Sequence, residues 1–142
     1  MPLIQVGAPK GAMCEEKQNT FMKKLSDAIM KSEGATVGDK DAESLVWAYY
    51  NEIQKKSCYL GGYIVDKQPI YITITSPVNA ISTEAKKVLT KEVQEMVNEA
   101  IGEYDGRLNY WLLFLDTEAD DTWGAGGDLF TLNQIQQVMN IK

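Results

Sequence analysis

Histidine is absent from this 142-residue chain, and arginine occurs once, at Arg107, against thirteen lysines. The missing histidine removes the commonest general base at neutral pH and the usual partner of a catalytic cysteine. The scarcity of arginine removes the side chain that best holds a carboxylate through two parallel hydrogen bonds. Acid–base chemistry in this protein must therefore use other groups.

Cysteine is also scarce. Cys14 and Cys58 stand far apart without a CxxC spacing, so we expect two reduced thiols, no zinc or other metal site, and no cofactor. The acidic stretch 116–121 resembles the start of a calcium loop, but it lacks glycine at the sixth position and has Gly127 in place of the bidentate glutamate. We therefore interpret this stretch as a solvated acidic loop.

Long apolar runs are missing as well, since none approaches the ~18 residues of a membrane span. The apolar segment 3–6 is too short for the core of a signal peptide. We therefore expect a cytoplasmic protein without membrane contact. A net charge of -6 argues against nucleic acid as a partner, because phosphate binding requires clustered cations.

The most informative feature that is present is Pro2, which follows the initiator directly and leads into an apolar, strand-like stretch. Removal of Met1 would leave a free secondary amine on Pro2, fixed in direction by the strand behind it. Such an amine is a candidate general base in a chain without histidine. The alternative is that Pro2 merely opens an edge strand, where proline is tolerated.

The apolar pattern repeats itself with an offset of roughly 67 residues. Apolar residues at three- and four-residue spacing predict two helices, and alternation or short apolar runs predict four strands. The expected order is strand Leu3–Val6, helix Glu15–Glu33, strand Leu45–Tyr50, then strand Ile70–Thr75, a helix capped by Ser82 or Thr83 that ends before Gly102, and strand Tyr110–Leu115.

This order predicts one domain over residues 1–142, built from two βαβ halves of about 2–66 and 67–142. We expect an α/β fold of the two-layer α+β type, with a four-stranded mixed sheet and two helices on one face. The Gly61-Gly62 pair predicts a hairpin over residues 58–65. The other sheet face would need a cover, for which a neighbouring subunit is the obvious candidate.

Pro2 on a first strand, two βαβ halves and a glycine-rich turn after a fourth strand together resemble the tautomerase superfamily. Its members include 4-oxalocrotonate tautomerase, macrophage migration inhibitory factor, malonate semialdehyde decarboxylase and the cis-3-chloroacrylic acid dehalogenases. The resemblance implies a homotrimer in which Pro2 acts as general base or acid on a small carbonyl or keto-acid substrate. Keto–enol isomerisation is the expected reaction, with lyase or dehalogenase chemistry as alternatives.

The resemblance also suggests substrate-binding residues. Decarboxylase and dehalogenase members place two arginines before the second helix, where this chain has Val78 and Ile81. The remaining candidates are Lys40, near a substrate-binding lysine of the inhibitory-factor branch, Tyr110, near its fourth-strand tyrosine, Asp121 as a tail carboxylate, and Arg107, which only a neighbouring subunit could bring to Pro2. A catalytically silent binding or assembly protein with this fold stays open as the second interpretation.

Overall fold

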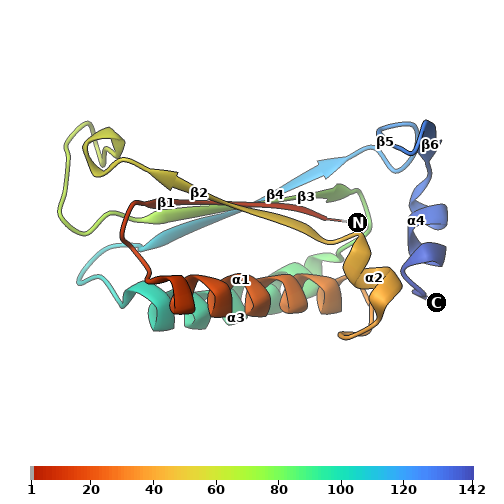
Figure 1. The fold of residues 1–142 in the computed structure, drawn as a ribbon, viewed down its shortest axis with the longest axis horizontal. Helices are drawn as coiled ribbons and strands as arrows, with labels where there is room; N and C mark the ends of the chain where they lie inside the picture. The colour runs from red at the N-terminus through yellow and green to blue at the C-terminus, as the bar shows by residue number, and fades with distance from the viewer. Residues whose placement is uncertain (1) are drawn as a thin grey trace.

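A four-stranded sheet carries two long helices on one face (Figure 1) in this computed structural model, which describes residues 2–142. The first half supplies β1 (Leu3–Pro9), α1 (Glu15–Ser32) and β2 (Trp47–Ile53), and the second supplies β3 (Ile70–Pro77), α3 (Thr83–Ile101) and β4 (Tyr110–Thr117). The two-layer α/β arrangement expected from the sequence is thus confirmed.

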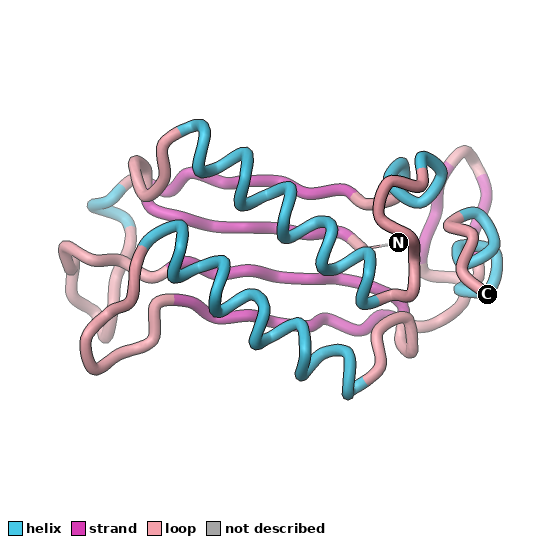
Figure 2. Tube along the Cα trace, turned by 90° about the horizontal axis from the view of Figure 1, so that it is seen from below, coloured by secondary structure: helices cyan, strands magenta, loops and turns pink. Residues whose placement is uncertain are grey.

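The strands lie in the order β2-β1-β3-β4. Each half pairs its own strands in parallel, through Leu3–Trp47 in the first half and Ile70–Tyr110 in the second. The two halves meet at the antiparallel pair of β1 and β3, where Ile4 lies opposite Ile74. Parallel pairs within each half require the crossover helices, and Figure 2 shows α1 and α3 side by side across the same sheet face.

The main core lies between this face and the helices. Alternate strand residues point inward because successive side chains of a strand face opposite sides. They meet the apolar stripes of the two helices, and the fully buried members are Ile4, Val6, Leu25, Ile29, Ile72, Ile74, Leu89, Val93 and Val97. Glu15 and Glu16 occupy the first turn of α1, and Ser82 caps α3 by accepting from Ala85 N.

Three local features differ from the sequence-based expectation. The second strand begins at Trp47 rather than Leu45, because the short helix α2 (Lys40–Ser44) precedes it and Leu45 is its C-cap. The expected hairpin over residues 58–65 is reduced to one bridge between Leu60 and Tyr63, which exchange two backbone hydrogen bonds of 2.7 and 3.0 Å. A 3₁₀ turn, η1 (Lys55–Ser57), comes before it.

The C-terminal segment forms a small hairpin and a helix instead of only a helix-like tail. The hairpin consists of β5 (Trp123–Ala125) and β6 (Asp128–Phe130), and α4 (Leu132–Val138) follows with a capping box between Thr131 and Gln134. A second small core, made of Met30, Ala35, Ala42, Ile135 and Met139, joins α4 to the end of α1 and to α2. Both chain ends, α2 and α4 therefore gather at one end of the molecule (Figure 1).

The sheet face away from the helices carries large exposed apolar side chains. We call it the open face and define it by Trp47, Tyr49, Tyr71, Trp111, Leu113 and Leu115. These residues line up across the sheet, since Tyr71 pairs with Trp111 and Thr75 with Leu115. Among the described residues, no helix combines the length and the apolar character that crossing a membrane requires.

Candidate functional site around Pro2

Pro2 is buried at the point where β1 begins, between the neighbouring strands β2 and β3. Its carbonyl oxygen accepts a hydrogen bond from Trp47 N at 3.3 Å, and the next residue, Leu3, pairs with Trp47 on one side and Thr75 on the other. Because both flanking strands hold this backbone, the nitrogen of residue 2 has a fixed position and direction. The predicted removal of Met1 concerns a residue outside the described part of the chain.

Ser76 and Asp116 continue the row of strand residues that begins with Pro2. Extending the β1–β3 register by one residue places Pro2 beside Ser76, which is buried and pairs with Asp116 on β4. Asp116 in turn binds Lys86 from the first turns of α3, whose Nζ lies 2.9 and 3.1 Å from the two carboxylate oxygens. Lys86 also lies 5.4 Å above the ring of Phe114.

Lys86 is therefore a half-buried cation at the sheet end that carries Pro2. Sequence reasoning missed Lys86 because the cations it considered for substrate binding were Lys40, Arg107 and the arginines that are missing from the turn before α3. Ile81, one of the residues in the arginine-equivalent positions, is buried as expected for an apolar replacement. The signal available in the sequence was the position of Lys86, four residues beyond the N-cap Ser82, since a residue there lies near the end of the sheet at which the helix begins.

Glu33 is a second group that sequence reasoning treated only as the end of a helix. It is the C-cap of α1 and is almost completely buried, at the same end of the molecule as the amino terminus (Figure 1). Burial raises the pKa of the Glu33 carboxyl above its ordinary value, and the positive charge of the amino terminus acts in the opposite direction.

The C-terminal hairpin borders the same end of the sheet. Trp123 donates from Nε1 to Thr117 Oγ1 at 2.7 Å, and Thr117 O accepts from Val78 N at 2.7 Å. Gly126 and Gly127 both have positive φ, which the tight turn between β5 and β6 requires. Trp123 is thus anchored to the end of β4, where it packs at the rim of the sheet.

The predicted substrate-binding residues divide between the two ends of the sheet. Lys40 lies on α2, at the Pro2 end, but its side chain is 93% exposed and only approaches Glu43, at 3.8 Å. Asp121 lies in the exposed turn between β4 and β5 at the same end, with a φ of 59°. Both residues stay predictions, because neither side chain contacts Pro2 through an interaction seen in the described part of the chain.

Tyr110 and Arg107 lie at the opposite end, where β4 begins. Tyr110 is buried and donates its hydroxyl to Thr90 O at 3.0 Å, and burial raises its pKa. The Arg107 guanidinium stacks over the Tyr104 ring at 4.7 Å and donates to Lys67 O. Within one chain these two residues cannot reach Pro2, so a role for either in substrate binding requires a neighbouring subunit.

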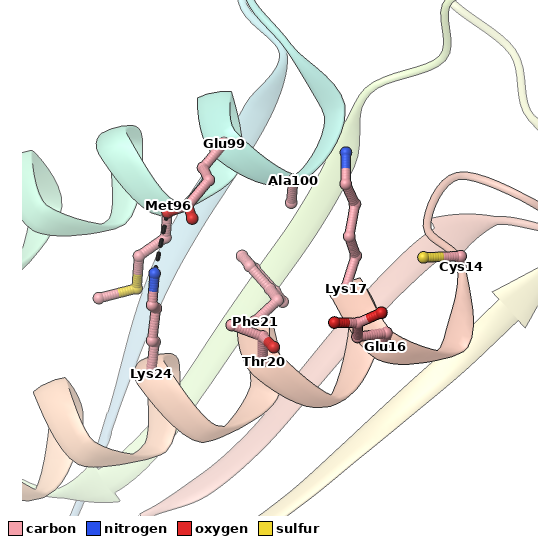
Figure 3. Close-up of a pocket in the computed structure, with 9 residues that line it drawn as sticks. All are labelled: Cys14, Glu16, Lys17, Thr20, Phe21, Lys24, Met96, Glu99 and Ala100. Carbon is pink, nitrogen blue, oxygen red and sulfur yellow. Dashed lines mark hydrogen bonds and ion pairs between the residues drawn. The ribbon is translucent and has the colours of Figure 1, made fainter.

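A separate cavity of about 280 Å³ lies on the helical face, between α1 and α3 (Figure 3). Phe21 forms part of its wall, and the ion pair of Lys24 and Glu99, 2.9 Å long, crosses it. Cys14 stands at its edge as a free thiol. No predicted site residue lies in this groove, and within residues 2–142 no group of three metal-ligating side chains gathers anywhere.

Comparisons with known proteins give a likeness of fold. No family model and no curated protein matches the sequence. Among solved structures, the Q0 fused 4-OT, a symmetric trimer, is 19% identical with a TM-score of 0.71 over 93% of this chain and 97% of its own. Pt0534 inactivated by 2-oxo-3-pentynoate is 17% identical with a TM-score of 0.72 over 89% and 95%.

A macrophage migration inhibitory factor-like protein from Entamoeba histolytica is 16% identical, with a TM-score of 0.67 over 91% of this chain and 98% of its own. Each of these comparisons spans most of both chains, so the likeness concerns the entire βαβ pair and not a single unit. The resemblance stated from the sequence is confirmed at the level of architecture. The chain therefore shares its fold with the fused 4-OT proteins and with the macrophage migration inhibitory factor-like protein.

Proposed function

We propose that this protein, after removal of Met1, is a tautomerase-like enzyme that uses the Pro2 amine as general base and acid on a small carbonyl or keto-acid substrate. The observation that carries the proposal is the position of Pro2, which is buried at the start of a central strand, bonded to Trp47 N and followed by Leu3, which pairs with Trp47 and Thr75. Desolvation disfavours the protonated form of such an amine and lowers its pKa toward neutrality. Proton transfer α to a carbonyl is the chemistry that such a base performs without histidine.

The surrounding groups support the same reaction. Lys86, the half-buried cation bound to Asp116, is a candidate to attract an anionic substrate in place of the missing arginines. Glu33 is a candidate acid–base partner at the amino-terminal end. The inactivation of the similar Pt0534 by a keto acid, 2-oxo-3-pentynoate, supports a keto-acid substrate for this chain too. Lyase or dehalogenase-like chemistry at the same amine is the alternative reaction.

The second candidate function is binding or assembly without catalysis. It is favoured by Val78 and Ile81 in the turn where decarboxylase and dehalogenase members carry arginines. In either case we propose a homotrimer, because the open face exposes six large apolar side chains and the similar Q0 fused 4-OT is a trimer. The proposal keeps four substrate-binding candidates, Lys40, Tyr110, Asp121 and Arg107. Tyr110 and Arg107 would act at Pro2 of a neighbouring subunit.

The test is the ketonisation of phenylenolpyruvate by protein with a free Pro2. We expect slow but measurable turnover, and Pro2→Ala should lower the rate by about 10²–10⁴-fold because the ring that directs the nitrogen is lost. A form that keeps Met1 should be at least as impaired, since an amide nitrogen has no usable lone pair. All forms carry their purification tag at the carboxyl end, so that the amino terminus differs only by Met1. The amino terminus of each form is verified by mass spectrometry.

Equal turnover by the free-proline and Met1-retaining forms would make Pro2 a structural strand opener. Absence of turnover in both would favour the binding or assembly function. Where the free-proline form turns over, Lys86→Gln separates substrate binding from the chemical step. Loss of this cation should raise KM for an anionic substrate more than it lowers kcat.

A further inference from the structure

A second cavity, of about 250 Å³, lies at the end of the sheet opposite Pro2. The connection between β2 and β3 extends past this end of the sheet (Figure 1), and residues of this connection and of the strands line the cavity. Tyr59, Tyr71 and Trp111 contribute aromatic side chains, and Gln68 and Pro69 come from the residues that lead into β3. We call this cavity the Pro69 pocket.

The internal repeat explains why a pocket exists at this place. Gln68-Pro69 precedes β3 as Met1-Pro2 precedes β1, and the first strand residues, Leu3 and Ile70, are 67 positions apart. The nitrogen of Pro69 belongs to a peptide bond inside the chain, so it has no free amine and no basic lone pair. The Pro69 pocket is therefore the counterpart of the Pro2 position in the second half, without its catalytic group.

Gln68 gives this pocket one defined polar atom. The residue is only 4% exposed, and its Nε2 donates to Lys55 O at 2.7 Å. This bond fixes the orientation of the Gln68 amide, because only its nitrogen, and not its oxygen, can donate to the carbonyl oxygen of Lys55. Oε1 is buried and has no hydrogen-bond partner among the described residues. A buried acceptor without a partner is uncommon and destabilising, so the atom is suited to a donor supplied by a ligand.

The other lining groups limit the chemistry of that ligand. No charged side chain lines the Pro69 pocket in the described part of the chain, and apart from Gln68, Ser57 and Cys58 the walls are aromatic and aliphatic. A cavity of about 150 Å³ is large enough to bind benzene, so the present one has room for one or two fused rings. We propose that the Pro69 pocket is a second, non-catalytic ligand site for a small, neutral, planar compound that donates one N–H or O–H to Gln68 Oε1.

The experiment compares indole with benzofuran, two neutral bicycles of nearly the same shape of which only indole has an N–H donor. Both are titrated into the full-length protein while the backbone amide and tryptophan side-chain N–H signals of the protein are recorded by NMR. We expect both to bind at the Pro69 pocket, with shifts at Tyr71 and Trp111, and indole to bind about 3–10-fold more tightly. The affinities should be the same with Met1 present or removed, which separates this site from Pro2.

Variants test the role of Gln68. In Gln68→Leu the preference for indole should fall to about one, whereas Gln68→Glu keeps an acceptor and should keep the preference. Tyr59→Ala should weaken both compounds alike without changing their ratio. Tyr63→Ala, in the same turn but outside the lining, should change neither affinity. Comparing the two ligands within each variant cancels any general loss of folded protein.

Equal affinities of the two compounds for the wild-type protein would overturn the proposal, since Oε1 would then have no role in binding. Shifts confined to the Pro2 end, or binding that depends on removal of Met1, would also overturn it and would assign the ligand to the amine site. Failure of both compounds to bind at millimolar concentration would show that the pocket takes no ligand of this class. None of these outcomes bears on whether Pro2 catalyses ketonisation.

Discussion

The carboxyl group of Glu33 shows how burial at one residue changes the response of the protein to pH. Its pKa is raised in the folded state, mainly by burial, so the folded protein binds a proton there more readily than the unfolded chain. The stability that this group contributes is therefore fully present below the ordinary glutamate pKa of about 4.3 and is lost as pH rises through the folded value. Burial of the charged form is what destabilises the protein at higher pH.

We predict that Glu33→Gln removes this loss. The free energy of unfolding of the wild type should fall relative to that of the variant as pH rises above about 4, as measured by urea denaturation at several pH values. Glu95→Gln, on the exposed side of α3, is the control and should leave the profile parallel to that of the wild type. Parallel profiles for Glu33→Gln would show that the amino-terminal charge offsets the cost of burial.

Lys86 and Glu33 could not be assigned to a site from the sequence, and the reason is physical. The burial of Glu33 depends on residues distant in sequence, because α4 and α2 pack on the end of α1. The contact of Lys86 with Asp116 joins a helix and a strand that are 30 residues apart. By contrast, the position of Pro2 at the start of a strand followed directly from the apolar stretch behind it, although the central place of that strand in the sheet did not.

At the scale of elements, the sequence predicted the long helices and strands, which have regular apolar periodicity, but it did not predict the short strands. The long helices α1 and α3 begin and end within about a residue of the sequence-based ranges, because their apolar stripes and caps are local. The strands β5 and β6 have three residues each, too few to show an alternating pattern. The start of β2 was misplaced because Leu45 is apolar, although it caps α2.

The antiparallel contact of β1 and β3 depends on a close approach that the sequence did not reveal. A Cβ atom built on Gly7 would lie 2.0 Å from Cε1 of Tyr71, its partner in the ladder, so the tyrosine ring covers the glycine backbone. Gly7 does not require positive φ, so the ring, and not the backbone conformation, is what excludes a larger residue. Tyr71 is in turn held against the open face by this contact.

We predict that the effect of Gly7→Ala on the free energy of unfolding changes sign when its partner Tyr71 is removed. In the wild-type background the methyl group displaces the Tyr71 ring, and the substitution should cost about 1 kcal/mol or more. In a Tyr71→Ala background the same change should stabilise by roughly 0.4–1 kcal/mol, because alanine reduces the entropy of the unfolded chain. A double-mutant cycle of urea unfolding measures the coupling. Additive effects of the two substitutions would contradict the ring-over-glycine contact.

For the whole molecule, the contrast between the two surfaces supports the proposed homotrimer. The helical face carries charged pairs such as Lys23–Asp27 and Lys24–Glu99. The open face exposes Trp47, Tyr49, Tyr71, Trp111, Leu113 and Leu115 together. A contiguous apolar surface of this kind on a sheet indicates an interface between copies, while isolated exposed apolar residues do not.

We predict that a charge in the centre of the open face separates the subunits. Leu113→Glu should convert the proposed trimer to monomers at micromolar concentration, because an unpaired carboxylate would be buried in each interface. Val88→Glu on α3 is the matched control: Val88 is as exposed as Leu113, 58% against 53%, but it faces away from the sheet and should leave the trimer intact. Sedimentation velocity distinguishes these states, and a wild-type monomer, or equal effects of both variants, would contradict an interface on the open face. The proposed trimer would bring Tyr110 and Arg107 of one subunit to Pro2 of another, so under this proposal the Leu113→Glu monomer should also lose turnover while its circular dichroism stays that of the folded chain.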